Sequence, residues 1–181
     1  MSRLDLFKQF YPDRFYDSAY DIAYDELYRQ GYRGIIFDVD NTLVEHGAPV
    51  NDKAETLFKE LHNQGFKTCI ISNNSEGRVK PLADKVNSCY VSKAGKPSPK
   101  NYIRAAEIMG MGKDKTFFVG DQIFTDVWGA NRAGVESFLV KPIAKHEEIQ
   151  IVLKRYLERI VMHFFFRKAV KISNYYSVDD N

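Results

Sequence analysis

One short stretch, residues 34–44 (GIIFDVDNTLV), constrains the fold more than any other part of this chain. Its apolar run, residues 35–37, is typical of a strand that is buried on both faces of a sheet. Asp38 and Asp40 follow directly, and Asn41 behind them favours a turn. In an open α/β sheet, ligands bind beyond the carboxyl ends of the strands. The stretch therefore predicts two acidic side chains at the edge of the sheet where chemistry usually takes place.

Four further short apolar runs predict strands at residues 66–71, 89–91, 116–119 and 136–140. Segments with helical spacing lie between them, and one begins at Asp52 and Glu55, which have the spacing of a capping box. Strands that alternate with helices predict an α/β fold, here with a parallel five-stranded sheet and helices on both faces. We expect the strand before Asp38 to lie centrally, beside the strands that end at Ser72 and Asp121.

Three later stretches carry polar residues after predicted strands: Ile-Ser-Asn-Asn (71–74), Gly-Lys-Pro-Ser-Pro (95–99) and Gly-Asp-Gln-Ile-Phe-Thr-Asp (120–126). An Asp-x-Asp pair by itself is a weak signal, because any acidic loop supplies one by chance. Four stretches in this order resemble the motifs of the haloacid dehalogenase (HAD) superfamily, and the resemblance runs over residues 1–145. The chain is most similar to the small YqeG-like branch, subclass III, which is similar to mitochondrial-type phosphatidylglycerophosphate phosphatases. The resemblance implies a three-layer, HAD-like (Rossmannoid) sheet.

Taken without the resemblance, each of these polar residues has two interpretations. A hydroxyl at a strand end suits a phosphate oxygen, but taken alone Ser72 is more typical of a helix cap. Lys96 is held between a glycine and a rigid Pro-Ser-Pro segment, which favours a fixed phosphate contact over a solvated charge. Asp121 and Asp126 suit Mg²⁺, which takes few protein carboxylates, or a helix cap with a surface charge.

The resemblance to HAD enzymes implies a role for each residue. Asp38 resembles the nucleophile that becomes an aspartyl phosphate, and Asp40 resembles the acid and base that serves the leaving alcohol. The dehalogenases of the superfamily lack an acid at the position of Asp40, so a phosphatase is favoured. The residues implied in phosphate binding are Ser72, Asn73 and Lys96, and those implied in holding Mg²⁺ are Asp38, Asp40, Asp121 and Asp126. Asp126 is either an alternative ligand or lies behind the direct ones.

The gaps between the motifs are short. HAD enzymes that act on small molecules often insert a cap domain after the first motif or between the second and third. A separate domain needs at least ~50 residues, and neither gap is that long. We therefore expect no cap domain, and a site that is open to solvent or covered by whatever the protein docks on.

Aromatic residues crowd the N-terminal segment, residues 1–33, which contains Pro12. We expect an arm that packs on or beside the phosphatase core, residues 34–145. The alternative is a surface that contacts lipid or a protein partner. A YqeG-like chain resembles this one here, with a Pro-containing aromatic segment ahead of the first motif.

The C-terminal segment, residues 146–181, contains apolar residues at helical spacing from Ile149 to Phe165, surrounded by Lys and Arg. A helix that packs on the sheet is one interpretation. The others are a basic amphipathic helix that lies on anionic lipid, in peripheral contact with a membrane, and a face that packs against a second subunit of a homo-oligomer.

Composition limits the remaining choices. A chain of 181 residues with 44% hydrophobic residues is most simply one globular domain, and a net charge of +2 does not call for a nucleic-acid partner. Cys69 and Cys89 lack metal-ligand spacing and are expected to be reduced thiols. The start of the chain carries charge where a signal peptide needs apolar residues, and no apolar run reaches the ~18 residues of a membrane span. We expect a cytoplasmic protein, either free or peripheral at the membrane.

These observations lead to one main functional hypothesis and two rivals. The main one is a Mg²⁺-dependent phosphate monoester hydrolase that dephosphorylates phosphatidylglycerophosphate, a choice of substrate that rests mainly on the resemblance. One rival is a soluble phosphatase that acts on a nucleotide, a sugar phosphate or a phosphoprotein. The other is a scaffold that binds a partner, although a scaffold has no need for the whole set of polar residues.

Overall fold

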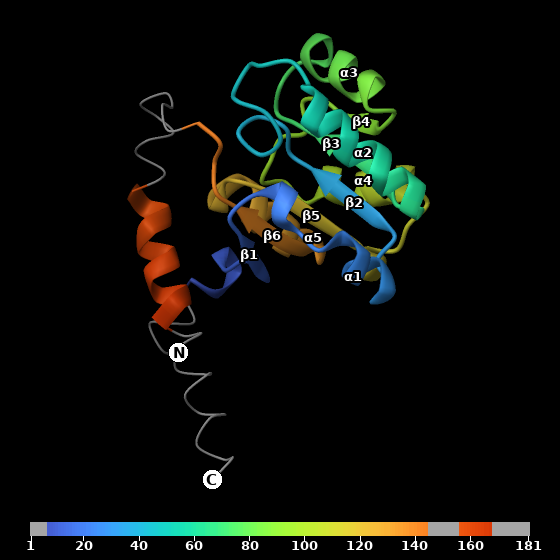
Figure 1. Ribbon diagram of the computed structural model, residues 1–181. Coiled ribbons are helices and arrows are strands. Elements are labelled where there is room, and N and C mark those ends of the chain that lie inside the picture. Colours follow the sequence, from blue (N-terminus) through green and yellow to red (C-terminus); the bar gives the residue numbers. More distant parts are fainter. Residues whose placement is uncertain (1–6, 145–155, 168–181) are drawn as a thin grey trace.

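The computed structural model describes residues 7–144 and 156–167, which form a parallel sheet with helices on both sides (Figure 1). The sheet has six strands in the order β1-β6-β5-β2-β3-β4. The strands are β1 (Arg14–Tyr16), β2 (Gly34–Phe37), β3 (Lys67–Ile71), β4 (Cys89–Val91), β5 (Thr116–Gly120) and β6 (Glu136–Val140). All neighbouring strands run parallel, so their carboxyl ends meet at one edge of the sheet.

The five predicted strands are confirmed, but the strand count was wrong by one. Residues 1–33 supply β1, which pairs with β6 at the edge of the sheet, with Phe15 opposite Leu139. An ion pair between Arg14 and Glu136, 3.0 Å apart, joins the two strands. The three residues of β1 are only half-buried and carry no apolar run, so no sequence pattern predicts a strand there.

The strand before Asp38 lies centrally, as predicted. β2 pairs with β3 on one side and with β5 on the other. All four of its residues are buried. Ile35 and Phe37 face one apolar cluster while Ile36 faces another, as the two-residue period of a strand requires. A strand covered on both faces has no place for polar residues before its end, which is why the acids begin at Asp38.

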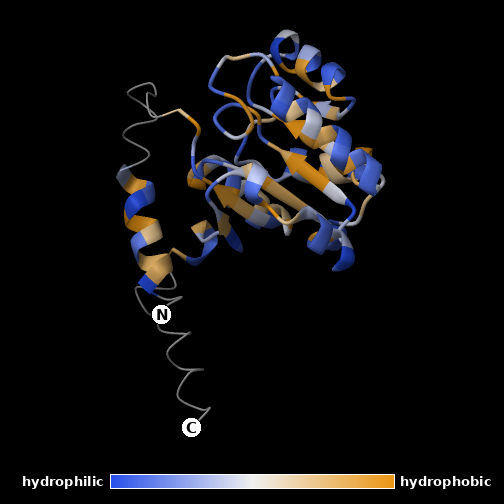
Figure 2. Ribbon diagram, in the orientation of Figure 1, coloured by the Kyte–Doolittle hydropathy of each residue, from blue (hydrophilic) through white to orange (hydrophobic). Residues whose placement is uncertain are grey.

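Helices cover both faces of the sheet. One face packs against α1 (Tyr24–Arg29), α2 (Asp52–Gln64) and α3 (Glu76–Lys85), and the other against α4 (Lys100–Ile108) and α5 (Trp128–Ala133). Short 3₁₀ turns are η1 (Lys8–Phe10), η2 (Ala19–Asp21) and η3 (Lys113–Lys115), and η4 (Ile123–Val127) is a π turn. Figure 2 colours the central strands as hydrophobic and much of the outer helices as hydrophilic. This three-layer arrangement is the predicted α/β fold.

The connections agree with the absence of a cap domain in the described part of the chain. Between β2 and β3 the chain forms one loop and α2, and between β3 and β4 it forms α3. The helix α2 begins one residue earlier than a capping box at Asp52 and Glu55 would place it. Its cap is Asn51, whose Oδ1 accepts the N–H of Ala54 (2.9 Å). Neither of these two connections forms a domain that covers the carboxyl edge of the sheet.

A helix over residues 156–167 packs against the N-terminal arm and η4. Ring pairs join Phe7 to Phe164 (5.5 Å between centroids), Tyr11 to Phe165 (5.6 Å) and Phe15 to Phe166 (5.9 Å). Val161 is buried in the same cluster. One side of the predicted C-terminal helix therefore contacts the protein itself. The start of the predicted stripe, including Ile149, and residues 1–6 and 168–181 lie outside the described residues.

Candidate active site

The ends of the central strands bring two acids together. Asp38 follows β2, and Asp121 follows β5, the neighbouring strand. The backbone N–H of Asp38 donates to the carbonyl of Val119 (2.9 Å), which extends the pairing of the two strands by one residue. Both side chains are buried, with Asp38 6% and Asp121 2% exposed. Adjacent parallel strands thus place two residues that are 83 positions apart in sequence at one point.

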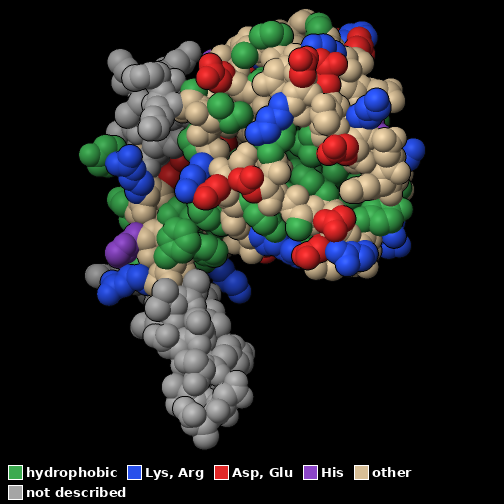
Figure 3. All heavy atoms as spheres, in the orientation of Figure 1, with side chains coloured by type: hydrophobic (Ala, Val, Ile, Leu, Met, Phe, Trp, Pro, Cys, Tyr) green, Lys and Arg blue, Asp and Glu red, His purple; other side chains and the backbone are tan. Residues whose placement is uncertain are grey.

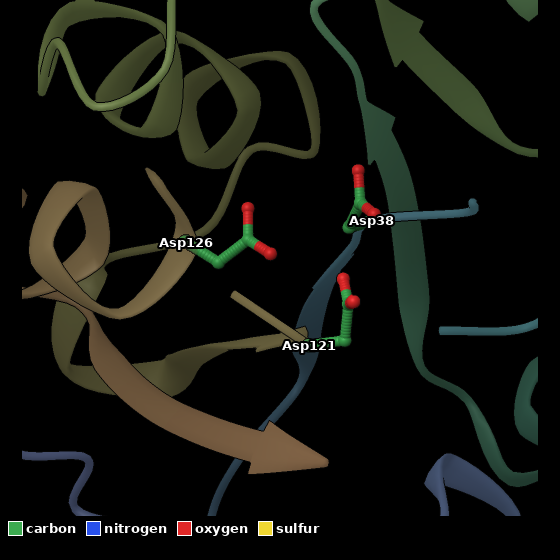
Figure 4. A group of neighbouring side chains, drawn as sticks. All are labelled: Asp38, Asp121 and Asp126. Carbon is green, nitrogen blue, oxygen red and sulfur yellow. The ribbon is translucent and has the colours of Figure 1, made fainter. Parts of the chain in front are cut away.

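Asp126 joins these two acids from the η4 turn. One carboxylate oxygen from each of Asp38, Asp121 and Asp126 lies within 4.8 Å of the others, and all three residues are buried. Figure 4 shows the three side chains gathered around a common space at the ends of the strands. Buried carboxylates this close repel one another unless a cation lies among them. The oxygen-only donor set fits a hard divalent ion such as Mg²⁺.

Lys96 supplies a cation from the protein itself. Its Nζ donates to Asp38 Oδ1 (2.6 Å) and to Asp126 Oδ1 (2.7 Å), and its side chain is only 6% exposed. Asn73 fixes the backbone of Lys96 on both sides, because its Oδ1 accepts the Lys96 N–H (2.7 Å) and its Nδ2 donates to the Lys96 carbonyl (3.3 Å). The side chain of Asn73 therefore orients the segment that carries Lys96.

The charges of this cluster shift each other's protonation. Burial raises the pKa of Asp38 to about 7, and the charges of Asp126 and Asp40 add to that rise while Lys96 opposes it. Burial alone would lower the pKa of Lys96, but the carboxylates of Asp126 and Asp38 outweigh it and hold that pKa well above its ordinary value. The ammonium of Lys96 therefore stays charged, and the Asp38 carboxyl is poised to change its charge near neutral pH.

Asp126 is held firmly by the protein. Its second oxygen, Oδ2, accepts the N–H of Gln122 (3.0 Å), so both oxygens have protein donors. Gly120 leaves room for it, since a Cβ there would lie 2.6 Å from Asp126 Oδ2. The hydroxyl of Tyr102 donates to the carbonyl of Thr125 (2.8 Å) and fixes the turn from the other side. Asp126 therefore has a protein donor on each oxygen, and it shares Lys96 with Asp38.

Asp40 lies apart from the acidic cluster and has its own donors. Its Oδ1 accepts the N–H of Gly47 (2.9 Å) and Nη2 of Arg78 (3.0 Å), and its Oδ2 accepts Nδ2 of Asn74 (2.8 Å). The side chain of Asp40 is 12% exposed. The carboxylate of Asp40 is therefore held by three donors of its own, on Gly47, Arg78 and Asn74.

Ser72 lies at the end of β3, beside the end of β2, as predicted. It is 4% exposed, and its Oγ accepts the N–H of Asn74 (3.2 Å). The structure thus assembles Asp38, Ser72, Lys96, Asp121 and Asp126 at one edge of the sheet, with Asp40 at its rim.

Three contacts of the site were not predicted from the sequence. Arg78 and Asn74 bind Asp40, and the hydroxyl of Thr42 donates to Asp121 Oδ1 (3.4 Å). Arg78 had one usable signal: it is the third residue of α3, and α3 begins directly after the stretch that contains Ser72. The first turn of a helix that leaves a catalytic strand end lies beside the site, so a charged residue there is a candidate.

Comparison with known proteins identifies the family. The sequence model of the haloacid dehalogenase-like hydrolases matches residues 45–134. The protein named "Probable phosphatase YqeG" of Bacillus subtilis (strain 168) is 36% identical over 163 residues, which span 90% of this chain and 95% of the relative. The chain belongs to the haloacid dehalogenase-like hydrolase family. The chain is accordingly a phosphatase, which confirms the prediction made from its polar residues and from its resemblance to HAD enzymes.

Two more distant proteins are also similar to the HAD chain. The "Phosphatidylglycerophosphate phosphatase 1, chloroplastic/mitochondrial" of Arabidopsis thaliana is 24% identical over 167 residues, which span 83% of this chain and 46% of the relative. The crystal structure of hypothetical protein XCC2798 from Xanthomonas campestris has a TM-score of 0.50 and 17% identity, with 68% of this chain and 71% of that chain covered. At this identity the structural similarity concerns the fold alone.

Proposed function

We propose that this HAD phosphatase hydrolyses a phosphate monoester through a covalent intermediate on Asp38. The observation that carries the proposal is the position of the Asp38 carboxylate, buried at the end of the central strand and 2.6 Å from the ammonium of Lys96. A carboxylate nucleophile divides one difficult step into two easier ones. Lys96 meanwhile provides fixed positive charge where phosphate oxygens would lie.

The chemistry balances with the residues at hand. An oxygen of Asp38 forms a bond to phosphorus while the bond from phosphorus to the ester oxygen breaks. Asp40, entering this step protonated, gives its proton to the departing alcohol. Asp40 then takes a proton from a water molecule, whose oxygen attacks phosphorus as the bond to Asp38 breaks. Inorganic phosphate leaves, and Asp38 and Asp40 return to their starting forms.

The remaining residues bind and orient the phosphate. Ser72 follows β3, the neighbour of β2, and Lys96 lies in the loop after β4; both are proposed to bind the non-bridging oxygens. Asn73 and Asp126 keep Lys96 in place through its backbone and its ammonium group. These contacts fix the phosphorus atom in front of the nucleophile.

The donor set indicates which residues would hold a metal. Asp38, Asp121 and the backbone carbonyl of Asp40 are the proposed ligands of Mg²⁺, with Asp126 behind them. When bound, Mg²⁺ supplies positive charge that offsets the repulsion between the nucleophile and the phosphate oxygens. Its binding is testable directly by calorimetry, with Asp121→Asn as the variant that loses a ligand.

For the substrate we propose the head-group phosphate of phosphatidylglycerophosphate. The Arabidopsis relative carries that substrate in its name, and the connections between the strands leave the site without a cap domain in the described part of the chain. A phosphate at the surface of a membrane needs a site that is open toward that surface.

The helix over residues 156–167 offers a surface for peripheral membrane contact. Large apolar side chains remain exposed on it: Tyr156 (66%), Leu157 (52%), Ile160 (49%) and Phe166 (46%). Arg159 and Arg167 are exposed on the same helix, whose acid, Glu158, is buried. Figure 3 shows hydrophobic side chains gathered where this helix meets the rest of the protein, with Lys and Arg at their border. Among the described residues, none of the helices combines the length and apolar character needed to cross a bilayer.

The catalytic proposal is tested by phosphate release. Wild type and Asp38→Asn are assayed with Mg²⁺ and with EDTA, on phosphatidylglycerophosphate in mixed micelles and on a panel of soluble phosphate esters. We expect Mg²⁺-dependent turnover of the lipid that Asp38→Asn abolishes. Turnover of soluble esters alone would reject the lipid substrate and leave the catalytic roles standing.

The membrane contact is tested by flotation with vesicles. We expect the protein to float with vesicles that contain anionic phosphatidylglycerol and to stay behind with neutral phosphatidylcholine vesicles. The double variant Leu157→Glu/Ile160→Glu should lose flotation. Ile108→Glu is the matched control, because Ile108 is 45% exposed on α4. If the helix face instead joins two copies of the chain, light scattering will show a dimer that the double variant dissociates.

A further inference from the structure

Arg78 keeps unused N–H donors on its guanidinium group beside Asp40. Its Nη2 makes both of its hydrogen bonds, to Asp40 Oδ1 (3.0 Å) and to the carbonyl of Ala48 (2.7 Å). Nε and Nη1 have no hydrogen-bond partner among residues 7–144 and 156–167. The Arg78 side chain as a whole is 26% exposed, so solvent reaches part of it. A guanidinium carries five N–H donors in a rigid fork, and most of them remain available here.

The position of Arg78 relative to Asp40 tells which part of a substrate would meet it. In the proposed reaction Asp40 serves the departing alcohol, so the group attached to that alcohol lies on the Asp40 side of the site. Lys96 is committed to Asp38 and Asp126, on the side of the transferred phosphate. The two cations therefore flank different halves of a bound ester.

We propose that Arg78 binds a second anionic group on the leaving portion of the substrate. The inference rests on the proposed function, because it uses the role of Asp40 to place the leaving alcohol. Nε and Nη1 each still have an N–H that can donate to one oxygen of a phosphodiester or a carboxylate, and the positive charge of the guanidinium group adds to the attraction. The substrate class is thus a phosphate monoester that carries a second acid a few bonds from the ester oxygen.

Two sources of substrate share this chemistry. The head group of phosphatidylglycerophosphate carries a phosphodiester on the same glycerol as its monoester, and a free metabolite such as 3-phosphoglycerate carries a carboxylate. Arg78 also restrains Asp40 and the loop at Ala48. Removal of Arg78 therefore has two separable effects. A less firmly held Asp40 slows the hydrolysis of every ester, while a lost anion contact slows the hydrolysis only of esters with a second acid.

The experiment compares matched esters. Glycerol 3-phosphate has no second anion, whereas deacylated phosphatidylglycerophosphate and 3-phosphoglycerate each have one. We expect wild type to prefer the two doubly acidic esters by kcat/KM, and Arg78→Gln to reduce this preference about 10- to 100-fold. Arg78→Lys keeps the positive charge but not the guanidinium group, and its preference for the doubly acidic esters should lie between those of wild type and Arg78→Gln. Arg29→Gln is the matched control, because Arg29 pairs with Asp25 on the surface and its side chain is 70% exposed.

The outcomes separate the anion subsite from a purely structural role. Equal losses on all three esters would mean that Arg78 only positions Asp40, and no preference in wild type would equally overturn the inference. Phosphatidylglycerophosphate in micelles is the fourth substrate: a further gain over its deacylated form assigns the substrate to a membrane, and none assigns it to solution. Thermal unfolding of each variant verifies that it is folded.

Binding distinguishes a failure of this inference from a failure of the catalytic proposal. Calorimetry on Asp38→Asn measures the affinity for each ester without turnover. Tighter binding of the doubly acidic esters, lost in Asp38→Asn/Arg78→Gln, supports the subsite even if wild type releases no phosphate. Equal affinity for the three soluble esters would overturn the subsite even if wild type hydrolyses them all.

Discussion

The carboxylate of Glu158 accepts a hydrogen bond from the backbone N–H of Ile123 at 2.7 Å. Glu158 belongs to the C-terminal helix and Ile123 begins η4, two residues after Asp121 and three before Asp126. Both residues are buried, at 6% and 1% exposed. A helix that we propose to contact the membrane is therefore bonded to the turn that carries Asp126 and begins two residues after Asp121.

Replacement of Glu158 tests whether this bond supports the site. Glu158→Leu leaves the N–H of Ile123 buried without its acceptor, which should cost about 1–3 kcal/mol of stability and lower kcat. Glu158→Gln is the matched control, since its amide oxygen still accepts the bond. Urea unfolding and turnover of a soluble ester measure the two effects. Equal stability and kcat for the two variants would show that the bond does not support η4.

Lys96 is expected to matter for both stability and catalysis. Lys96→Met keeps most of the length but leaves the buried carboxylates of Asp38 and Asp126 without their shared cation. Loss of one partner of a buried ion pair costs about 3–5 kcal/mol, and loss of a phosphate contact should lower kcat about 100-fold or more. Unfolding in EDTA and a turnover assay check both numbers.

Two comparisons sharpen the test on Lys96. Lys100→Met is the control, since Lys100 is exposed at the start of α4. Added Mg²⁺ should narrow the stability gap between Lys96→Met and wild type, because a divalent ion can neutralise the same carboxylates. A Lys96→Met protein that matches Lys100→Met in EDTA would contradict the idea that the ion pairs hold the cluster together.

The sequence predicted the residues that lie directly at the ends of buried strands. Asp38, Ser72 and Asp121 each follow an apolar run, so the run fixes the strand and the strand fixes the place of the polar residue after it. Pairing between adjacent strands then brings the three together. Such residues can be found by local pattern, because the signal and the position share the same few residues.

Features set by distant contacts could not be found in this way. β1 is a strand only because β6 lies beside it, and its own three residues carry no period. Arg78 meets Asp40 across 38 positions, and its one local signal, a place in the first turn of α3, does not identify Asp40 as its partner. Even the predicted start of α2 differs by one residue from the observed one. Asn51 and Asp52 are both residue types that cap helices well, and in the structure Asn51 is the cap.

His62 should make the stability of the protein depend on pH. Burial, and then the charge of Lys67, lower the pKa of His62, while its Nε2 lies 2.9 Å from Thr68 Oγ1. The unfolded chain therefore takes up the proton more readily than the folded one. The contribution of neutral His62 to the free energy of unfolding is fully present above pH about 6.5, the ordinary pKa of histidine. It is lost as the pH falls through the lowered pKa of the folded protein.

Urea unfolding of wild type and His62→Gln between pH 8 and pH 5 measures this contribution. We expect the free energy of unfolding to fall less steeply with decreasing pH in His62→Gln, because the variant has no imidazole to protonate. His46→Gln, at an exposed position, is the control for removal of an imidazole. Identical slopes in all three proteins would rule out the assigned shift at His62.

The raised pKa of Asp38 predicts that metal affinity depends on pH around neutrality. Burial raises this pKa to about 7 in the metal-free protein, and a proton and a metal ion compete for the same carboxylate. Below this pKa Mg²⁺ must displace the proton, so its apparent affinity should fall about tenfold per pH unit well below pH 7 and level off above it. Calorimetric titration with Mg²⁺ at pH 6, 7 and 8 measures the trend. Asp38→Asn, which has no proton to displace at this position, should bind more weakly but with a flatter dependence, whereas a wild-type affinity that is equal at pH 6 and pH 8 would remove Asp38 from the metal site.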